Sequence, residues 1–321
     1  AVSKTTTITF TPDAAMRVVV SVNPPNLKAG STVAAIITAT AVDRYDNPVS
    51  GVVLTGTTVP ITLGIVSGLG TTNASGLVTG TWKAGTIVGE GQLRVYGRYN
   101  GAISGTTDIA VYANDPSTVF VQVISPTLFA NSGMTTTVTA IVQDVHSNPI
   151  PGMVVNFSLS SSTLGSVTAS GTTNAYGRAF GVYTASVPSD PGSGLLTATV
   201  GYDGSSRSGS VPITLTADVP CTLTLQAVPI TQVVGVNSVL TATVTDRFGN
   251  DVANGTSVTF TTDLGDASSP RATIDGIATS VISSTLIGTA HITATSGTAQ
   301  DTMAVSFVPD VPSTIELQAH P

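Results

Sequence analysis

Hydrophobic and polar residues alternate over short stretches along the whole chain, and turn-forming residues separate the stretches. Residues 239–260 show the pattern most clearly. Threonines separate the apolar residues of its first half, which are Leu240, Ala242 and Val244. Because successive side chains of a strand point to opposite faces, this alternation predicts a half-buried β-strand. A turn-forming cluster at 246–250 follows, and Val258 and Phe260 then mark the returning strand.

The same strand-turn-strand unit occurs three times. Four similar junctions, each with an aspartate, lie 102, 103 and 92 residues apart, at Asp13, Asp115, Asp218 and Asp310. A repeat of about 100 residues with frequent turn signals is typical of an immunoglobulin-like (Ig-like) sandwich. We therefore expect three such domains, over 13–114, 115–217 and 218–309. Two flanking segments are predicted to be the last strand of a preceding repeat and the first strand of a following one, at 1–12 and 310–321.

The closing strand of each repeat is predicted to turn two side chains inward, five and three residues before the junction aspartate. These pairs are Ala110 with Tyr112, Ile213 with Leu215, and Val305 with Phe307. Ile8 and Phe10 have the same spacing from Asp13, which is why residues 1–12 are predicted to be such a strand. The alternation predicts that each pair packs into the core of its sandwich.

Composition supports an all-β fold and excludes several classes of function. Hydrophobic residues make up 41% of the 321 residues, enough for packed cores, whereas charged residues make up only 9%. No capped segment has the 3.6-residue period of a helix. The net charge of -7 is spread over turns without a basic patch, which argues against nucleic-acid binding. No apolar run is long enough to span a bilayer, and 1–10 lacks the features of a signal peptide, so we expect a mature form or an excised piece.

Two motifs recur at the turns. The first reads Asp-x-x-Gly/Asp/Ser-Asn-Pro/Asp-Val/Ile followed by Gly-x-x-Val-x-Phe, and the second reads Thr-x-Asn/Asp-x-x-Gly-x-Ala. Together they resemble the bacterial Ig-like domains (group 1) of the invasin and intimin adhesins, over nearly all of 13–309. The resemblance implies modules stacked into a rod that holds an adhesive tip away from an outer membrane. The first repeat departs from the motif at Gly56, where an aromatic residue is expected, and Trp82 is a candidate to fill that space.

No group of residues predicts catalysis. We therefore expect that the protein is not an enzyme and that it has no catalytic or cofactor-binding residue. The histidines belong to different repeats, at His146, His291 and His320. The chain has no nucleophile-elbow motif and no phosphate-binding loop between strand and helix. Most aspartates coincide with predicted turns, where their side chains bind local backbone.

Calcium bound at the domain junctions is the alternative role for the aspartates, because hard cations take carboxylate and carbonyl oxygens. The candidate ligands are Asp43, Asp46, Asp115, Asp218, Asp246 and Asp251. Turn capping is favoured, because Asp46 and Asp251 have no acidic counterpart in the second repeat and the spacing is unlike an EF-hand. The single cysteine, Cys221, is predicted to be a small residue at a junction.

Two kinds of covalent modification have weak sequence support. Isopeptide crosslinks need a buried lysine in each domain, and the chain has only Lys4, Lys28 and Lys83. Glycosylation sequons begin at Asn73, Asn156 and Asn254, but Asn156 is predicted to lie within a strand.

The sequence thus predicts an extracellular protein of the cell surface. The favoured function is a rod-like stalk of Ig-like repeats that presents a distal binding domain to a receptor or another protein chain. The alternative is a segment of a self-assembling filament or sheath, because uncharged, threonine-rich faces weaken repulsion between chains and permit a homo-oligomer or fibre. A carbohydrate-binding module is disfavoured, since no strand carries a row of aromatic residues.

Overall fold

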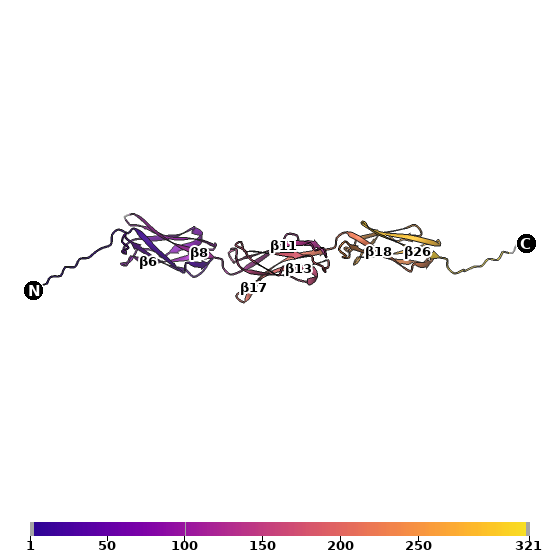
Figure 1. The fold of residues 1–321 in the computed structure, drawn as a ribbon, viewed down its shortest axis with the longest axis horizontal. Coiled ribbons are helices and arrows are strands. Elements are labelled where there is room, and N and C mark those ends of the chain that lie inside the picture. Colours follow the sequence, from indigo (N-terminus) through magenta and orange to yellow (C-terminus); the bar gives the residue numbers. More distant parts are fainter. Residues whose placement is uncertain (1–2, 100, 319–321) are drawn as a thin grey trace.

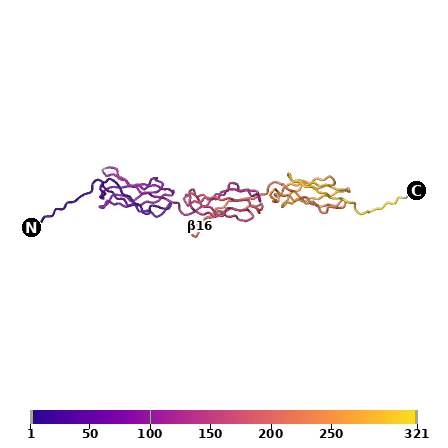
Figure 2. Tube along the Cα trace, viewed as in Figure 1, coloured from indigo at the N-terminus to yellow at the C-terminus, as the bar shows by residue number. Residues whose placement is uncertain are grey.

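Three β-sandwiches follow one another along the chain in a computed structural model that describes residues 3–99 and 101–318 (Figures 1 and 2). The predicted all-β, tandem Ig-like fold is therefore confirmed. Each sandwich packs two sheets around its own hydrophobic core, and the core residues span Ala15–Val111, Val119–Leu215 and Leu223–Phe307. No helix in the described residues is long and apolar enough to cross a membrane.

The first sandwich pairs the sheets β1-β3-β6-β5 and β2-β8-β7-β4. Its elements are β1 Arg17–Asn23, β2 Asn26–Lys28, β3 Ala35–Val42, β4 Leu54–Val59, a 3-10 helix Ile61–Leu63, β5 Gly64–Ser67, β6 Leu77–Ala84, β7 Gly89–Arg98 and β8 Ala102–Tyr112.

The second sandwich pairs the sheets β13-β15-β11-β9 and β10-β17-β16-β12-β14. Its elements are β9 Thr118–Val123, β10 Thr127–Phe129, β11 Thr135–Gln143, β12 Val154–Leu159, a 3-10 helix Ser162–Leu164, β13 Ser166–Val167, β14 Ser170–Thr172, β15 Arg178–Thr184, β16 Gly192–Tyr202 and β17 Ser205–Thr216.

The third sandwich pairs the sheets β18-β20-β24-β22 and β19-β26-β25-β21-β23. Its elements are β18 Pro220–Val228, β19 Thr231–Val233, β20 Ser238–Asp246, β21 Ser257–Thr262, β22 Asp266–Ala267, β23 Arg271–Ala272, β24 Ile277–Ser283, β25 Gly288–Ser296 and β26 Ala299–Val308. In all three sandwiches the first long strand is followed by a short strand in the opposite sheet. This short strand pairs in parallel with the last strand of the sandwich.

The predicted alternation holds in β20 and β21. Leu240, Ala242, Val244 and Val258 are completely buried, and Phe260 is 3% exposed. Trp82 and Tyr183 occupy matching places in their sandwiches. The Trp82 indole N–H donates to the carbonyl of Leu63 at 3.1 Å, and the Tyr183 hydroxyl donates to that of Leu164 at 2.8 Å. Each large ring is thus buried with its one polar atom satisfied.

Two detailed predictions are wrong. A side chain at Gly56 would meet Val66 and Leu69 at 2.8 and 3.0 Å from its Cβ, so these residues, and not Trp82, fill the place of the aromatic ring. Tyr112 is 53% exposed, although it is predicted to point inward. Of the other predicted inward residues, the structure buries Ala110, Ile213, Leu215, Val305 and Phe307.

The described parts of the two flanking segments, 3–12 and 310–318, form no strand. Ile8 and Phe10 are 77% and 92% exposed, and Ile315 and Leu317 are exposed as well. A strand is defined by hydrogen bonds to a neighbour, and these segments pair with no described strand. Their assignment to further repeats stays a prediction.

Candidate functional site at the domain junctions

A buried aspartate lies at the same end of every sandwich, where the chain enters it; we call this end the entry pole. The three residues are Asp43, Asp144 and Asp246, and each is at most 2% exposed. In each, Oδ1 accepts hydrogen bonds of 2.8–2.9 Å from the backbone N–H groups two and four residues further on. The interpretation of Asp43 and Asp246 as turn caps is therefore confirmed.

The second carboxylate oxygen, Oδ2, ties the turn to the linker. It accepts from the side-chain amide of the asparagine four residues on, at 2.9–3.1 Å. It also accepts from one linker N–H, at 2.8–2.9 Å, which belongs to Asp13, Asn114 or Asp218. Asn114, and not Asp115, thus matches the other junction aspartates. Counting from Asp115 shifts the first closing strand by one residue, which explains the wrong orientation predicted for Tyr112.

Each of these carboxyl groups is held in its charged form. Burial raises the pKa of Asp43, but the hydrogen bonds from Asn47, Asp13 and Tyr45 outweigh it and lower that pKa to about 2. The pKa values of Asp144 and Asp246 are lowered for the same reason, against the same opposing effect of burial. A charged acceptor strengthens every hydrogen bond that it receives.

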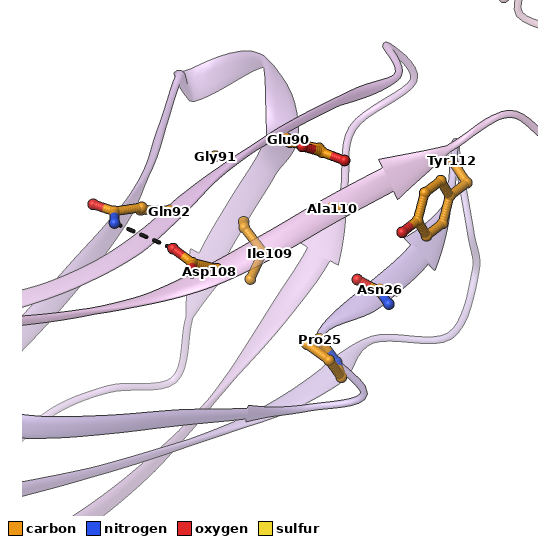
Figure 3. Close-up of a pocket in the computed structure, with 9 residues that line it drawn as sticks. All are labelled: Pro25, Asn26, Glu90, Gly91, Gln92, Asp108, Ile109, Ala110 and Tyr112. Carbon is orange, nitrogen blue, oxygen red and sulfur yellow. Dashed lines mark hydrogen bonds between the residues drawn. The ribbon is translucent and has the colours of Figure 1, made fainter.

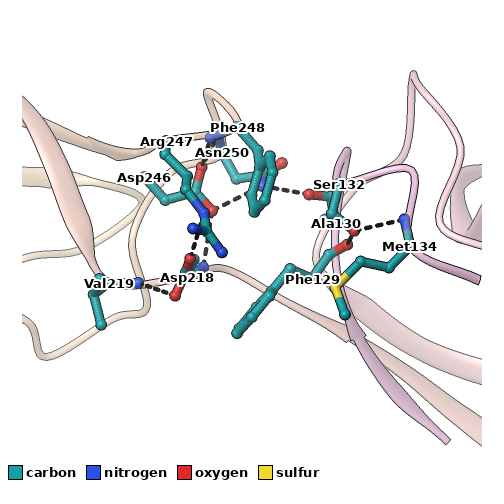
Figure 4. A network of polar contacts seen from close by, with 10 residues as sticks. All are labelled: Phe129, Ala130, Ser132, Met134, Asp218, Val219, Asp246, Arg247, Phe248 and Asn250. Carbon is teal, nitrogen blue, oxygen red and sulfur yellow. Dashed lines mark hydrogen bonds and ion pairs between the residues drawn. The ribbon is translucent and has the colours of Figure 1, made fainter. Parts of the chain in front are cut away.

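The asparagines of two entry poles reach across to the preceding sandwich. The Asn148 amide donates to the carbonyl of Thr86 at 2.8 Å, and its Oδ1 accepts from the Val88 N–H at 3.2 Å. Asn250 donates to the carbonyl of Ala130 at 2.9 Å and accepts from the Asn131 amide at 2.7 Å. Figure 4 shows the second of these junctions. Both asparagines are at least nine-tenths buried, so each junction is closed by a desolvated polar contact.

The remaining contacts differ between the two junctions. At the first, the Lys28 ammonium binds the Asp115 carboxylate at 2.5 Å and lies 5.9 Å from the centre of the Tyr202 ring. At the same junction the His146 imidazole lies against Gly30, where a Cβ would be 2.2 Å from Nε2. At the second, the rings of Phe129 and Phe248 stack with centroids 6.3 Å apart (Figure 4).

The remaining candidate calcium ligands have other partners or lie apart. Asp46 pairs with Arg17, and Asp218 pairs with Arg247 at 2.9 Å. Asp251 lines a cleft of about 660 Å³ at the second junction, together with Asp190 and Asp275. Within the described residues, no three His, Cys, Asp or Glu side chains are placed to hold a metal ion.

The other residues singled out by sequence are dispersed. His291 pairs with Asp263 at 2.8 Å, far in sequence from the junction residue His146, and His320 lies outside the described residues. Cys221 is exposed. Of the sequon asparagines, Asn73 and Asn254 accept backbone hydrogen bonds in turns, and Asn156 lies in β12 as predicted.

The surface of the first sandwich has a depression that contains two acidic residues. It has a volume of about 580 Å³ and lies beside β2, β7 and β8 (Figure 3). Its acidic residues are Glu90 and Asp108, and Asp108 accepts a hydrogen bond of 3.2 Å from Gln92. The nine described residues that line it include no serine, cysteine, histidine or lysine. Its lining therefore contains no Ser–His or Cys–His pair of the kind used in acyl transfer.

Comparisons with known proteins agree with this architecture. Residues 118–216, the second sandwich, match the family model of the bacterial Ig-like domain (group 1). The crystal structure of invasin, a bacterial integrin-binding protein, superposes with a TM-score of 0.56 at 19% identity, covering 92% of this chain and 60% of that one. FdeC, an Escherichia coli adhesin, gives 0.54 at 22% identity, covering 93% and 100%. InvD of Yersinia pseudotuberculosis gives 0.57 at 18% identity, covering 91% and 98%.

The chain is therefore a tandem array of Ig-like domains with the fold of these three proteins. Its second sandwich matches the model of the bacterial Ig-like domain (group 1), and the predicted resemblance to invasin-type adhesins is confirmed.

Proposed function

We propose that this chain is a stiff spacer in an extracellular stalk on a bacterial surface, which holds a distal binding domain away from the cell. The observation that carries the proposal is the pair of buried asparagines, Asn148 and Asn250, which bind their own turn and the preceding sandwich at once. A buried amide that loses its partner costs about 1–3 kcal/mol, so bending at either junction is opposed. The role is mechanical and not catalytic.

Short linkers support the same role. Only residues 113–117 lie between β8 and β9, and only 217–219 lie between β17 and β18. One N–H of each linker is bound by the buried aspartate of the next sandwich. The partner of the distal domain is proposed to be a receptor protein, by analogy with the integrin binding of invasin.

The test is the shape of the chain in solution. Spin labels in neighbouring sandwiches report the distribution of distances across each junction. In the wild type we expect one narrow distribution of distances across each junction. In the double variant with Asn148→Ala and Asn250→Ala we expect broad distributions. Asn156→Ala, which changes an exposed asparagine in β12, is the matched control and should keep the narrow distributions. Broad distributions in the unmodified chain would refute the spacer.

The filament alternative has one observation in its favour. The outer face of the four-stranded sheet of the second sandwich exposes Phe120, Phe180 and Val182 at 54%, 54% and 45%. Solvent-exposed aromatic residues are enriched at protein contacts. Sedimentation at increasing concentration distinguishes the two functions, because a filament segment associates through this face whereas a spacer stays monomeric. Phe120→Ser with Phe180→Ser should abolish any such association.

A further inference from the structure

The entry poles of the first and third sandwiches share an aspartate, an arginine, an aromatic ring and an asparagine at matching positions. In both, an arginine after the buried aspartate pairs with the linker aspartate, Arg44 with Asp13 at 3.1 Å and Arg247 with Asp218 at 2.9 Å. In both, that guanidinium lies 4.7 Å from the centre of the next side chain's ring, Tyr45 or Phe248. The second sandwich has a different set at these positions, namely Asn114, Val145 and His146.

The third entry pole shows what this arrangement binds. Its Phe248 stacks on Phe129, and its Asn250 binds the carbonyl of Ala130 and the side chain of Asn131. We call this end of the second sandwich its exit pole, which consists of residues 129–131. The contact therefore needs a ring, a carbonyl and an amide donor, in that order along the chain.

The first entry pole has the matching groups. Asn47 donates to Asp43 at 3.1 Å, as Asn250 does to Asp246 at 2.9 Å. Among the described residues, the Asn47 amide makes no second contact of the kind that Asn148 and Asn250 make. Tyr45 is 67% exposed. Polar and aromatic groups in this geometry are complementary to the exit pole just described.

We infer that the entry pole of the first sandwich is a docking surface for the exit pole of another Ig-like sandwich, joined ahead of Asp13, whose end resembles that of the second sandwich. An exit pole like that of the first sandwich is a poor match. Its Lys28 binds Asp115, and the residue in the corresponding position of the first entry pole is Ala14, which has no charge. The inference rests on the proposed spacer function and adds a rule for which sandwiches can follow one another.

A chain with an additional sandwich tests this rule. Residues 114–217 are duplicated ahead of Asp13, so that Ala217 precedes Asp13 as it precedes Asp218 in the natural chain. Hydrogen exchange is followed by mass spectrometry in the peptide 43–48, which occurs only once in this chain. We expect exchange about tenfold slower than in the natural chain. Asn47→Ala should remove that protection.

The matched control carries Phe129→Lys and Asn131→Gly in the added copy, which gives it the residues of the first exit pole. This control should not protect 43–48. The rule would be overturned if the unmodified and the substituted added copies slowed exchange in 43–48 equally, or if neither slowed it. If the added copy fails to fold, Phe248→Tyr in the natural chain decides, since the rule requires the second junction to accept a tyrosine without faster exchange in 246–252. Rapid exchange at both natural junctions would instead refute the spacer itself.

Discussion

At the scale of single residues, one buried carboxylate organises each entry pole because its two oxygens serve different segments. Oδ1 closes the turn that contains it, and Oδ2 binds both the linker and the asparagine that reaches the neighbouring sandwich. An asparagine in place of Asp246 would turn an NH₂ group toward N–H donors and lose acceptors. The position therefore requires an aspartate.

Replacing this carboxylate should destabilise one sandwich. We expect Asp246→Ala to lower the free energy of unfolding of the third sandwich by about 2–4 kcal/mol, because four buried or half-buried donors lose a charged acceptor. Urea denaturation followed by hydrogen exchange in β20 and β21 measures the loss. Asp251→Ala, five residues away and exposed, should change it by less than about 0.5 kcal/mol. Similar losses in both variants would contradict this role.

The lowered pKa of Asp43 predicts a pH dependence of stability. Its folded-state pKa is about 2, below the ordinary value of about 3.9 in an unfolded chain. The unfolded state thus binds the proton more readily, so the contribution of Asp43 is complete above about pH 4 and is lost as the pH falls towards 2. We expect the difference in Tm between wild type and Asp43→Asn to be constant from pH 7 to 5 and to shrink below 4. A difference that grows on acidification would have the wrong sign.

At the scale of elements, the alternating pattern was sufficient to predict strands and their buried faces. The burial of Leu240, Ala242 and Val244 follows from a period of two, which is a local property of the chain. The filling of the space at Gly56 could not be predicted in the same way. Val66 and Leu69 reach it from β5 and the following loop, and only the packing of the two sheets brings them there.

The junction contacts are a further case that local patterns could not reveal. Asn148 and Asn250 bind groups about 60 and 120 residues earlier in the chain. The only signal in the sequence was an asparagine four residues after each turn aspartate, which reads equally well as a turn residue. Its second role depends on how successive sandwiches meet.

The turn between β2 and β3 predicts a coupling across the first junction. Gly30 has a φ of +67°, and a Cβ there would be 2.2 Å from Nε2 of His146. We expect Gly30→Ala to destabilise the chain by at least about 1 kcal/mol through the left-handed backbone alone, and to move His146 as well. In a double-mutant cycle with His146→Ala, the part of the destabilisation that comes from the clash with the imidazole should disappear. The part that comes from the left-handed backbone at position 30 should remain. Strict additivity of the two substitutions would show that the residues do not interact.

At the scale of the whole molecule, three similar sandwiches are joined by two junctions of different chemistry. Both use the buried aspartate and asparagine, but the first adds an exposed ion pair from the preceding sandwich to the linker, and the second adds rings stacked between the two sandwiches. The contact made by the buried aspartate and asparagine is thus shared, whereas the additional contacts, and with them the expected response to solvent conditions, are specific to each junction.

Metal removal should leave the array unchanged. The carboxylates of Asp43 and Asp246 are already used by N–H donors, and Asp46 and Asp218 pair with arginines. We expect the Tm to be the same with excess chelator and with millimolar calcium. A rise in Tm with calcium would instead support the junction-site alternative, and Asp251→Asn would locate it at the cleft of the second junction.

Salt should loosen the first junction and spare the second. Lys28 and Asp115 are each about half exposed, with side-chain exposures of 52% and 49%, so their attraction is screened when the Debye length falls to about 3 Å at 1 M salt. At the second junction the Arg247–Asp218 pair joins the linker only to the third sandwich, and the contact between the second and third sandwiches, Phe129 with Phe248, is apolar and is not screened. Spin-label distances should therefore broaden with salt across the first junction only, and Lys28→Met should remove the salt response without abolishing the hydrogen bonds of Asn148. Equal broadening at both junctions would show that the ion pair has no part in holding the first and second sandwiches together.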